Sequence, residues 1–256
     1  MERERLNQKQ LNDILRKHKM WMNRQQRGEQ AIFQDVDISG LDLSNRDLRG
    51  VAFYNVMANQ TDFSKSRIGH NLFNNCDISG STFCNSEGFD IQMMDCKAQS
   101  VLFIDAKLKN INVDSTDLSK SDFTNTKLRK SCFTNIPSMD ETLFEKNNFS
   151  EAVFTNIQSM QNAIFKNENF TNSLFKNVNL DNTSLENVSF SEKGSKNIFD
   201  NVSLCNAIIS GKSFFEKDGK KYQLSYYYEH QLEIEEGKVI PLENSSVSSP
   251  SLPIEQ

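Results

Sequence analysis

Residues suited to catalysis or metal binding are scarce in this sequence and do not cluster. The three histidines, His18, His70 and His230, lie far apart, and the five cysteines include no Cys-x-x-Cys pair, so neither a zinc site nor a dithiol redox motif is indicated. No glycine-rich phosphate loop and no nucleophile elbow occurs. We therefore predict no catalytic residue, no bound metal and no cofactor, and we interpret the chain as a protein that is not an enzyme.

The acidic residues recur at a regular spacing and do not form a cluster. An Asp precedes an apolar residue in VDISG, LDLSN, RDLRG, TDFSK, CDISG, TDLSK and SDFTN. Of the 23 pentad centres between Phe33 and Leu143, 19 are Phe, Leu, Ile, Met or Val. A helix repeats every 3.6 residues and a strand every 2, so a strict period of five predicts a coil that turns by a fixed angle per pentad. Carboxylates that belong to such a repeat are no evidence of acid–base catalysis.

The aromatic residues indicate how many pentads make one turn. With four pentads per turn, centres 20 residues apart stack, and every Phe of this frame falls on two opposite walls: Phe33, Phe53, Phe73, Met93, Val113, Phe133 and Leu43, Phe63, Phe83, Phe103, Phe123, Leu143. The other two walls carry smaller residues: Ile38, Ala58, Ile78, Ala98, Leu118 and Leu48, Ile68, Gly88, Leu108, Leu128. Such an arrangement would fill a narrow square core.

Two of the cysteines occupy the same inward position on adjacent coils in this frame. Cys76 and Cys96 are 20 residues apart and should therefore lie one above the other. A disulfide between them is geometrically conceivable, but we favour two reduced, buried thiols, as expected for a cytoplasmic protein.

The pentads resemble those of the pentapeptide-repeat proteins, whose consensus is Ala-Asp/Asn-Leu-X-X. The resemblance covers residues 31–215 and implies an all-β solenoid, a right-handed quadrilateral β-helix of about nine coils. Departures from the consensus are Gly88 and Ser138 at pentad centres and Pro137 beside one of them. Later centres shift by one or two residues, so we predict bulged corners or short loops near residues 144–148, 157–164 and 191–196.

Solenoid ends need covers, and the sequence offers one at each end. Residues 1–30 predict a helical cap, with an apolar face over Leu6–Met22 in which His18 and Trp21 pack on the first coil. Residues 216–243 predict a hairpin around Asp218–Gly219 and a second glycine-containing turn, followed by a disordered tail at 244–256. This C-terminal segment either caps the last coil or forms a homodimer; the candidate contacts for a cap or a dimer are Trp21, Tyr222, Tyr226, Tyr227 and Tyr228.

Some positions expected to face outward are apolar, namely Phe89, Met94, Ile104, Met139 and Phe144. One interpretation is a local frame slip that turns Phe89 inward in place of Gly88. The alternative is an exposed patch of Phe89, Met94 and Ile104 that binds a protein partner.

Charge and hydropathy limit the setting of the protein. Residues 1–30 carry a net charge of +4, the repeat region −5 and residues 216–256 −4, and none of these is typical of direct nucleic-acid binding. No apolar run is long enough for a membrane span, and the polar N-terminal residues lack a signal-peptide core. We therefore expect a soluble cytoplasmic protein, with export by a route that needs no N-terminal signal as an open alternative.

Three functions from different classes remain. We favour a non-catalytic protein–protein interaction scaffold, a targeting module or an effector, which presents a rigid surface to a protein partner. The resemblance also implies an alternative, a DNA mimic that modulates a type II topoisomerase such as gyrase, as in the quinolone-resistance group. That mechanism needs a continuous negative potential along one side, which Lys127, Arg129 and Lys130 interrupt in the sequence. The third, an enzyme or small-ligand protein, lacks any supporting motif.

Overall fold

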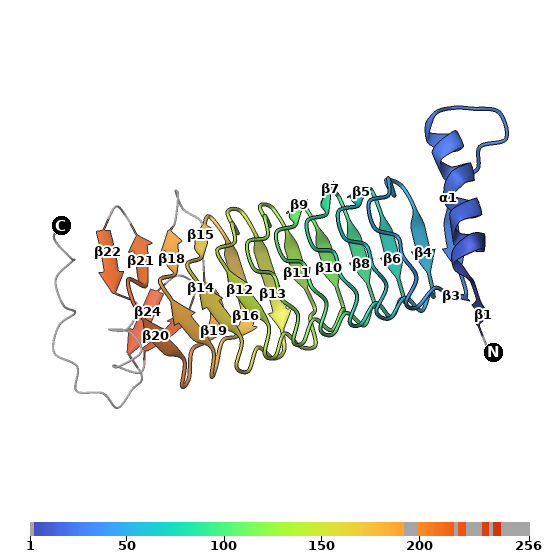
Figure 1. The fold of residues 1–256 in the computed structure, drawn as a ribbon. Coiled ribbons are helices and arrows are strands. Elements are labelled where there is room, and N and C mark those ends of the chain that lie inside the picture. Colours follow the sequence, from blue (N-terminus) through green and yellow to red (C-terminus); the bar gives the residue numbers. More distant parts are fainter. Residues whose placement is uncertain (1–2, 192–198, 218–219, 224–231, 236–237, 242–256) are drawn as a thin grey trace.

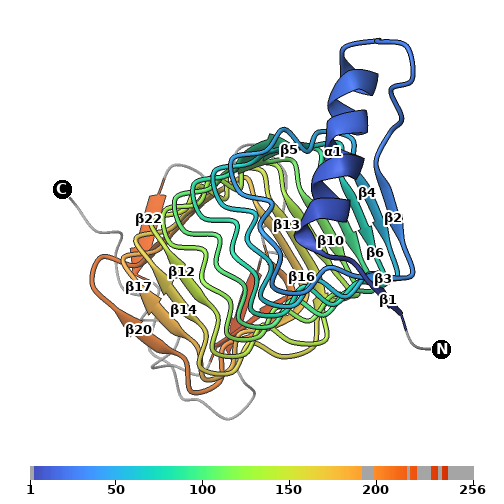
Figure 2. The same cartoon turned by 45° about the vertical axis from the view of Figure 1, so that its right-hand side comes forward.

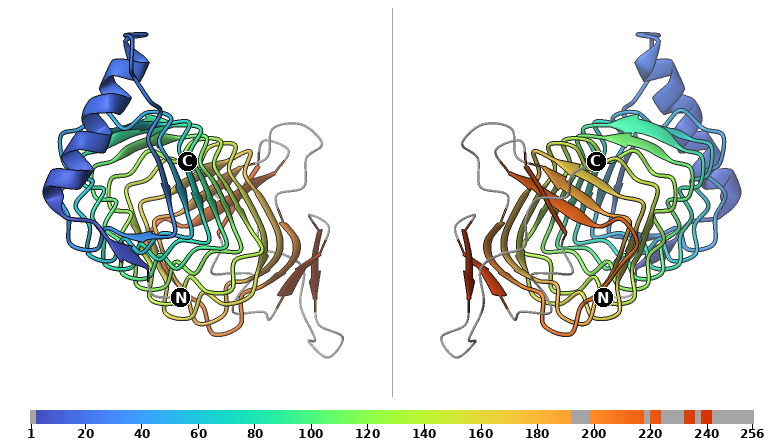
Figure 3. Two further views of the ribbon diagram at one scale, coloured as in Figure 1. Left: turned by 90° about the vertical axis from the view of Figure 1, so that its right-hand side faces the viewer. Right: turned by 90° about the vertical axis from the view of Figure 1, so that its left-hand side faces the viewer.

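The computed structural model describes residues 3–191, 199–217, 220–223, 232–235 and 238–241, and it is a parallel β-solenoid. Figure 1 shows a rod of stacked coils, with helix α1 (Gln8–Met22) at one end and the last strands at the other. Along the rod axis the coils have a four-sided outline (Figure 3). We number the four sides as walls 1 to 4 in chain order, beginning with the centres Phe33, Ile38, Leu43 and Leu48.

Wall 1 is a continuous sheet along the whole rod. Nine of its strands pair in parallel, so eight turns of the solenoid separate the first from the last. They are β2 (Ile32–Gln34), β4 (Ala52–Tyr54), β6 (Leu72–Asn74), β8 (Gln92–Met94), β10 (Asn112–Asp114), β11 (Cys132–Thr134), β13 (Val153–Ile157), β16 (Leu174–Asn179) and β19 (Phe199–Ser203).

The other walls are built partly from strands and partly from single bridges. Wall 4 contains β5 (Arg67–Gly69), β7 (Glu87–Phe89) and β9 (Lys107–Lys109), and later β15 (Asn169–Thr171), β18 (Ser189–Ser191) and β21 (Phe214–Lys217). Wall 3 contains β12 (Leu143–Glu145), β14 (Ile164–Lys166), β17 (Ser184–Glu186) and β20 (Ile208–Ser210). Wall 2 contains β3 (Val36–Asp37) and a ladder of isolated parallel bridges.

The register confirms four pentads per turn. Phe33 pairs with Phe53, Phe53 with Phe73, and Ile68 with Gly88, each 20 residues further along the chain. Each coil therefore lies directly over the one before it, and backbone N–H and C=O groups pair along the rod axis.

The corners explain why the period is five. Nearly every fifth residue has a positive φ, as at Asn45, Asn55, Lys65 and Asn75 (φ 56°, 53°, 56° and 53°). Asn is the commonest residue at these corners, because its short polar side chain tolerates the left-handed conformation better than most. Each pentad is thus an extended piece closed by one left-handed residue.

The core is a column of stacked rings. On wall 3, Phe63, Phe83 and Phe103 stack with centroids 4.6 and 5.2 Å apart, and on wall 1 Phe53 and Phe73 stack at 4.6 Å. Rings from the two walls meet edge to face at about 6.1 Å. Offset stacking along a wall and T-shaped contact across it are the two favourable aromatic geometries.

The confinement of Phe to two walls holds only for the earlier coils. From residue 149 onward wall 4 also carries rings, since Phe149 stacks on Phe170 and Phe170 on Phe190 at 5.2 and 4.9 Å. The prediction of aromatic rings on two facing walls is therefore wrong for the second half of the rod.

The first frame shift lies earlier than the sequence predicted. Left-handed corners at Asn135 and Glu141 enclose six residues instead of five, so the extra residue is in the Pro137 pentad and not at 144–148. Met139 and Phe144 are consequently buried centres, and Ser138 and Leu143 are not. The second extra residue lies between Asn156 and Asn162, as predicted, and both six-residue pieces stack on wall 2. The third predicted loop falls largely on residues outside the described part of the chain.

Gly88 keeps its place at a pentad centre, so the predicted slip that would bury Phe89 is wrong. A Cβ on Gly88 would lie 2.0 Å from the carbonyl oxygen of Ile68, which excludes any larger residue without backbone movement. Phe89 remains on the outer face and is 45% exposed.

The N-terminal cap contains more than the predicted helix. Asn7 caps α1 in a capping box with Gln10. The strand β1 (Glu4–Arg5), an element not predicted from the sequence, pairs in parallel with β3 and covers the first coil edge. Figure 2 shows α1 lying across the end of the rod. Leu11, Leu15 and His18 of α1 are buried against the rod.

Two antiparallel pairs follow the solenoid, as predicted. Strand β21 pairs with β22 (Lys220–Gln223) across residues 218–219, and β23 (Leu232–Glu235) pairs with β24 (Lys238–Pro241). Strand β23 also pairs antiparallel with β19 through Val202 and Ile234, so it extends the wall 1 sheet.

Candidate interaction surface

The three residues of the predicted patch do not share one side of the rod. Phe89 lies on wall 4, Met94 on wall 1 and Ile104 on wall 3, because they follow the centres Gly88, Met93 and Phe103. Met94 and Ile104 are partly exposed but lie on opposite walls. The sequence frame already contained this result, since centres ten residues apart belong to opposite walls.

Phe89 has different neighbours from those predicted. Its ring contacts His70 edge to face at 4.7 Å and lies over Gly69. Phe89 and His70 line a shallow hollow beside the N-terminal helix together with Trp21, Arg49 and Gly50. Trp21, predicted to pack on the first coil, stacks on His18 at 5.4 Å and remains 41% exposed.

The tyrosines proposed as cap or dimer contacts are only partly covered by the structure. The backbone of Tyr222 pairs with Phe215 in the β21–β22 hairpin. Tyr226, Tyr227 and Tyr228 lie outside the described residues.

His18 fastens the helical cap to the solenoid. Its Nδ1 accepts a hydrogen bond from the Ala31 N–H at 3.1 Å, so the proton is on Nε2, which donates to the Arg49 carbonyl at 3.1 Å. The ring is fully buried, and this burial lowers the pKa of His18, although the Arg49 carbonyl and the Asp47 carboxylate partly oppose the shift. A neutral imidazole therefore joins α1 to walls 1 and 4 of the first coil, and its role here is structural.

A second buried titratable group lies in the later coils. Glu168 is 2% exposed, and its carboxyl accepts from the Asn147 N–H at 3.1 Å. Burial raises the pKa of Glu168 to about 8, and the hydrogen bonds from Asn147 only partly offset this. Its partner Asn147 in turn accepts from the Thr126 N–H, so a polar column crosses three coils.

The buried cysteines are free thiols. Cys76 and Cys96 lie on adjacent coils, and the hydrogen bond between the two thiols, together with burial, raises the pKa of Cys96. A thiol in this environment remains protonated and is a poor nucleophile.

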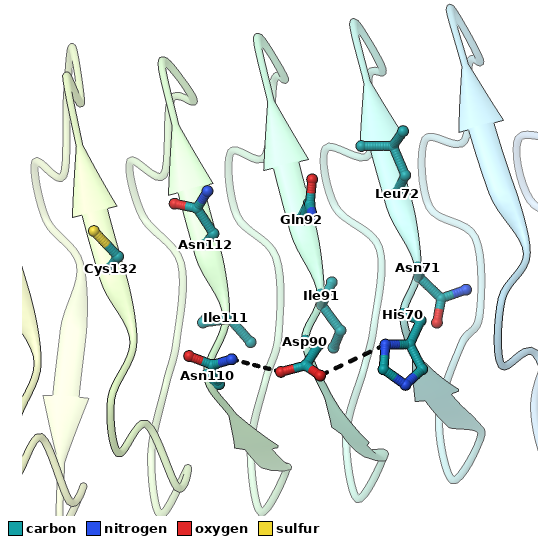
Figure 4. Close-up of a pocket in the computed structure, with 10 residues that line it drawn as sticks. All are labelled: His70, Asn71, Leu72, Asp90, Ile91, Gln92, Asn110, Ile111, Asn112 and Cys132. Carbon is teal, nitrogen blue, oxygen red and sulfur yellow. Dashed lines mark hydrogen bonds and ion pairs between the residues drawn. The ribbon is translucent and has the colours of Figure 1, made fainter.

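A groove runs along the corner between walls 4 and 1 (Figure 4). Leu72, Gln92, Asn112 and Cys132 form one row across successive strands, beside a corner ladder of His70, Asp90 and Asn110. Asp90 accepts from the Asn110 side chain at 2.5 Å and lies 3.5 Å from His70 Nδ1. The groove is wide and shallow, and no cluster of three metal-binding side chains occurs among the described residues.

The Asp that precedes many centres closes its own pentad. Asp37, Asp62 and Asp117 each accept a hydrogen bond from the backbone N–H two residues later, at 2.8, 2.8 and 3.0 Å. Asn does the same at positions 148, 169 and 179. A side-chain oxygen at this position closes the pentad, and a negative charge is not required for that bond.

Charged side chains are nevertheless distributed unevenly among the four walls. Of the outward residues next to the centres of walls 2 and 3, most are uncharged and ten are acidic: Asp37, Asp77, Asp117, Asp140 and Asp181 on wall 2 and Asp42, Asp62, Asp122, Glu145 and Glu186 on wall 3. We call these ten residues the acidic side. Lys97 and Lys166 are the basic residues among the same outward positions.

Wall 4 has the opposite balance. Its outward positions carry Arg49, Arg67, Lys107, Lys109, Lys127 and Arg129 against Asp47 and Glu87. Lys127 and Arg129, and Lys130 at the adjoining corner, therefore do not interrupt the acidic side, contrary to the sequence analysis. Several of these cations pair locally, as Lys107 does with Glu87 and Arg129 with Glu151.

No helix in the described part of the chain is long and apolar enough to cross a membrane.

Comparison with known proteins gives a consistent assignment. The family description "Pentapeptide repeats" matches residues 99–135 and 159–191 in eight copies. The quinolone resistance pentapeptide repeat protein QnrB96 of Scandinavium goeteborgense is 31% identical over 85 residues. That match spans 32% of this chain and 39% of the relative.

Two solved structures show a limited likeness to this chain. Full-length QnrB1, a plasmid-mediated fluoroquinolone resistance protein, matches 70% of this chain and 84% of its own at 20% identity and a TM-score of 0.40. HetL of Nostoc sp. strain PCC 7120, involved in heterocyst differentiation regulation, matches 80% and 97% at 13% identity and a TM-score of 0.28. The pentads that the family description matches stack four to a coil, so this part of the chain consists of pentapeptide repeats.

Proposed function

We propose that this chain is a non-catalytic interaction module that presents its acidic side to a protein partner with a basic surface. The observation that carries the proposal is the sorting of charge by wall. The wall opposite wall 2 is basic, so the rod has a strongly asymmetric electrostatic potential around its axis. Such a field orients an approaching partner and favours one contact face over the others.

The acidic side needs an explanation other than folding. Because Asn closes the same hydrogen bond at 148, 169 and 179, the repeat tolerates an uncharged residue at this position. The six Asp residues that precede centres on walls 2 and 3 therefore add charge that the fold does not require. In a rod whose layers are about 4.8 Å apart, Asp37, Asp77 and Asp117 lie two layers from one another, and this fixed spacing suits a complementary basic surface.

The test separates charge from folding. In one variant Asp37, Asp62, Asp77, Asp117 and Asp122 are all replaced by Asn, which keeps the side-chain oxygen and removes the charge. The matched control replaces Lys107, Lys109 and Lys127 on wall 4 by Gln. We expect affinity capture with the wild-type chain and with the wall 4 control to retain the same proteins, and the Asn variant to lose them. Retention of the same proteins by all three chains would contradict the proposal.

A second candidate uses the same surface. The resemblance to the quinolone-resistance group suggests that the acidic side imitates DNA and occupies a type II topoisomerase. The support specific to this chain is that Lys127, Arg129 and Lys130 lie away from walls 2 and 3. Purified DNA gyrase in a supercoiling assay tests it: inhibition or protection from a quinolone that the Asn variant lacks favours DNA mimicry, and no effect of the wild-type chain excludes it for that enzyme.

A further inference from the structure

Wall 1 differs from the other three walls in having almost no charge on its outer face. Beside the centres of its first eight strands, β2 to β16, the charged residues are Asp114 and Lys176. The remaining positions include Ile32, which is 54% exposed, and Tyr54, which is 37% exposed. A flat sheet face with exposed apolar residues and little charge is typical of a protein-binding surface.

One row on this face has a symmetrical composition. The residues that precede the centres of the eight strands are, in order, Ile32, Ala52, Leu72, Gln92, Asn112, Cys132, Val153 and Leu174. Three apolar residues are followed by two amides and then by three apolar residues. Figure 4 shows the middle of this row, with Leu72, Gln92, Asn112 and Cys132 side by side on β6, β8, β10 and β11.

A second copy of the chain fits this pattern. A two-fold axis that runs along the strand direction, between β8 and β10, places the row of one copy against the same row of its partner in reverse order. Ile32 then faces Leu174, Ala52 faces Val153 and Leu72 faces Cys132. The amides of Gln92 face those of Asn112, where they are able to form hydrogen bonds. A two-fold contact needs this kind of self-complementary surface.

The other two-fold arrangement is less favourable. An axis parallel to the rod would place this row against the row that follows the centres, so that Ile32 faces Gln34 and Leu72 faces Asn74. Apolar residues would then face polar ones along most of the contact.

Charge also selects wall 1. In a two-fold contact each wall meets itself, so walls 2 and 3 would bring carboxylates against carboxylates and wall 4 would bring cations against cations. Like charges held together at an interface are strongly unfavourable. Wall 1 alone avoids this repulsion among the four walls as the structure describes them.

We propose that wall 1 is a self-association face, on which two copies of this chain pack as an antiparallel dimer with the acidic sides turned outward. Eight layers at about 4.8 Å and a strand piece of about 10 Å give a contact of only a few hundred Å² per copy. This is at the low end for specific interfaces, so the dimer is weak and depends on concentration.

Sedimentation of the full chain over roughly 5 to 500 µM tests the proposal. We expect a reversible monomer–dimer equilibrium that Leu72→Lys weakens at least tenfold. Ile164→Lys, at a 40% exposed position on wall 3, is the control and should leave the equilibrium unchanged. A monomer at all concentrations would overturn the proposal, as would a dimer that survives Leu72→Lys and therefore uses another surface, such as the C-terminal segment.

Cross-linking tests the orientation without depending on the stability of the Lys variant. Leu72→Cys should form an intermolecular disulfide with Cys132 of a second copy under mild oxidation, and Leu72→Cys combined with Cys132→Ser should not. Equal cross-linking of the two chains would rule out the antiparallel register. The acidic side is not part of this contact, so a failure here leaves the proposed function untouched.

Discussion

The coils of residues 31–135 differ from those of residues 136–190 in spacing and in where their rings lie. The earlier coils keep a strict period of five, carry Phe on walls 1 and 3, and place Gly88 on wall 4. The later coils contain two six-residue pieces on wall 2 and carry Phe on wall 4 as well. The backbone ladder continues through both regions, so the solenoid tolerates an inserted residue on wall 2.

The comparison extends to the polar column inside the rod. At equivalent inward positions the earlier coils have Ala106 and Thr126, and the later coils have Asn147 and Glu168. A buried hydroxyl can donate a hydrogen bond to a neighbouring backbone carbonyl, as the Thr126 hydroxyl does to the Phe103 carbonyl. Burying a carboxyl group costs more free energy than burying a hydroxyl. The carboxyl of Glu168 also makes the stability of the later coils depend on pH, which Ala106 and Thr126 do not do in the earlier coils.

The largest expected effect is on the later coils. Since the folded-state pKa of Glu168 is about 8 and its ordinary value is 4.5, the folded state holds the proton between these values while the unfolded state releases it. The free energy of unfolding should therefore fall with rising pH across this window, by at most about 1.4 kcal/mol per pH unit. Glu168→Gln keeps an acceptor for Asn147 and should remove most of this slope. Urea unfolding at pH 4.5, 6 and 8 measures it; an unchanged slope would contradict the assignment.

Removing one phenylalanine ring from each region compares how much the aromatic packing of the two regions contributes to stability. Phe154 stacks on Phe133 and Phe175 and meets Phe149 and Phe170 edge to face. Phe154→Ala should cost roughly 3–5 kcal/mol of unfolding free energy. Phe103 stacks on two rings, so we expect Phe103→Ala to cost about 1 kcal/mol less. Chemical denaturation of both variants measures the difference, and a larger loss for Phe103→Ala would reverse the comparison.

A substitution at Gly88 tests the pentad centre of the earlier coils that has no side chain. A Cβ there would meet the Ile68 carbonyl oxygen, so Gly88→Ala should lower the unfolding free energy by roughly 1–3 kcal/mol. Gly69→Ala on the adjacent coil of the same wall is the control, since its Cβ would lie at an ordinary 3.5 Å from its neighbours. Thermal unfolding of the two variants should separate them, and equal midpoints would show that the close contact relaxes freely.

The smallest expected effect is local and concerns the cap. Burial holds the pKa of His18 below its ordinary value, so the stabilisation from the neutral ring is complete above the unfolded-state pKa and is lost as the pH falls. Protonation would turn Nδ1 from an acceptor into a donor, so it could no longer accept the hydrogen bond from the Ala31 N–H. Hydrogen exchange of that amide should therefore accelerate at low pH, and His18→Gln should abolish the pH dependence of its protection. A pH-independent wild-type amide would count against this role for His18.

Much of the fold could be predicted because the residue types within each pentad indicate which residue points inward and which forms the corner. Centres such as Phe53 and Phe63 identify the inward position, and corners such as Asn55 and Asn75 identify the left-handed residue, so the 20-residue register follows by counting. The first frame shift was misplaced because Ser138 and Leu143 kept the apparent period for two pentads after the insertion. Strand β1 was missed because a two-residue edge strand has no periodic signal.

The candidate surfaces were harder to predict. Grouping Phe89, Met94 and Ile104 treated nearness in sequence as nearness in space, whereas in a four-walled coil five residues change the wall. Sorting the charges by wall needs only the register and could have been done from the sequence, and it would have assigned Lys127 and Arg129 to the wall opposite wall 2.

The most direct test of the account is the binding of one captured partner, measured by titration calorimetry, to three chains: wild type, the five-Asn variant of the acidic side and the three-Gln variant of wall 4. We predict that the Asn variant loses roughly tenfold or more in affinity, an effect that weakens with added salt, while the Gln variant stays within about twofold of wild type. Equal affinities for the wild-type chain and the Asn variant would contradict the claim that the acidic side is the functional surface.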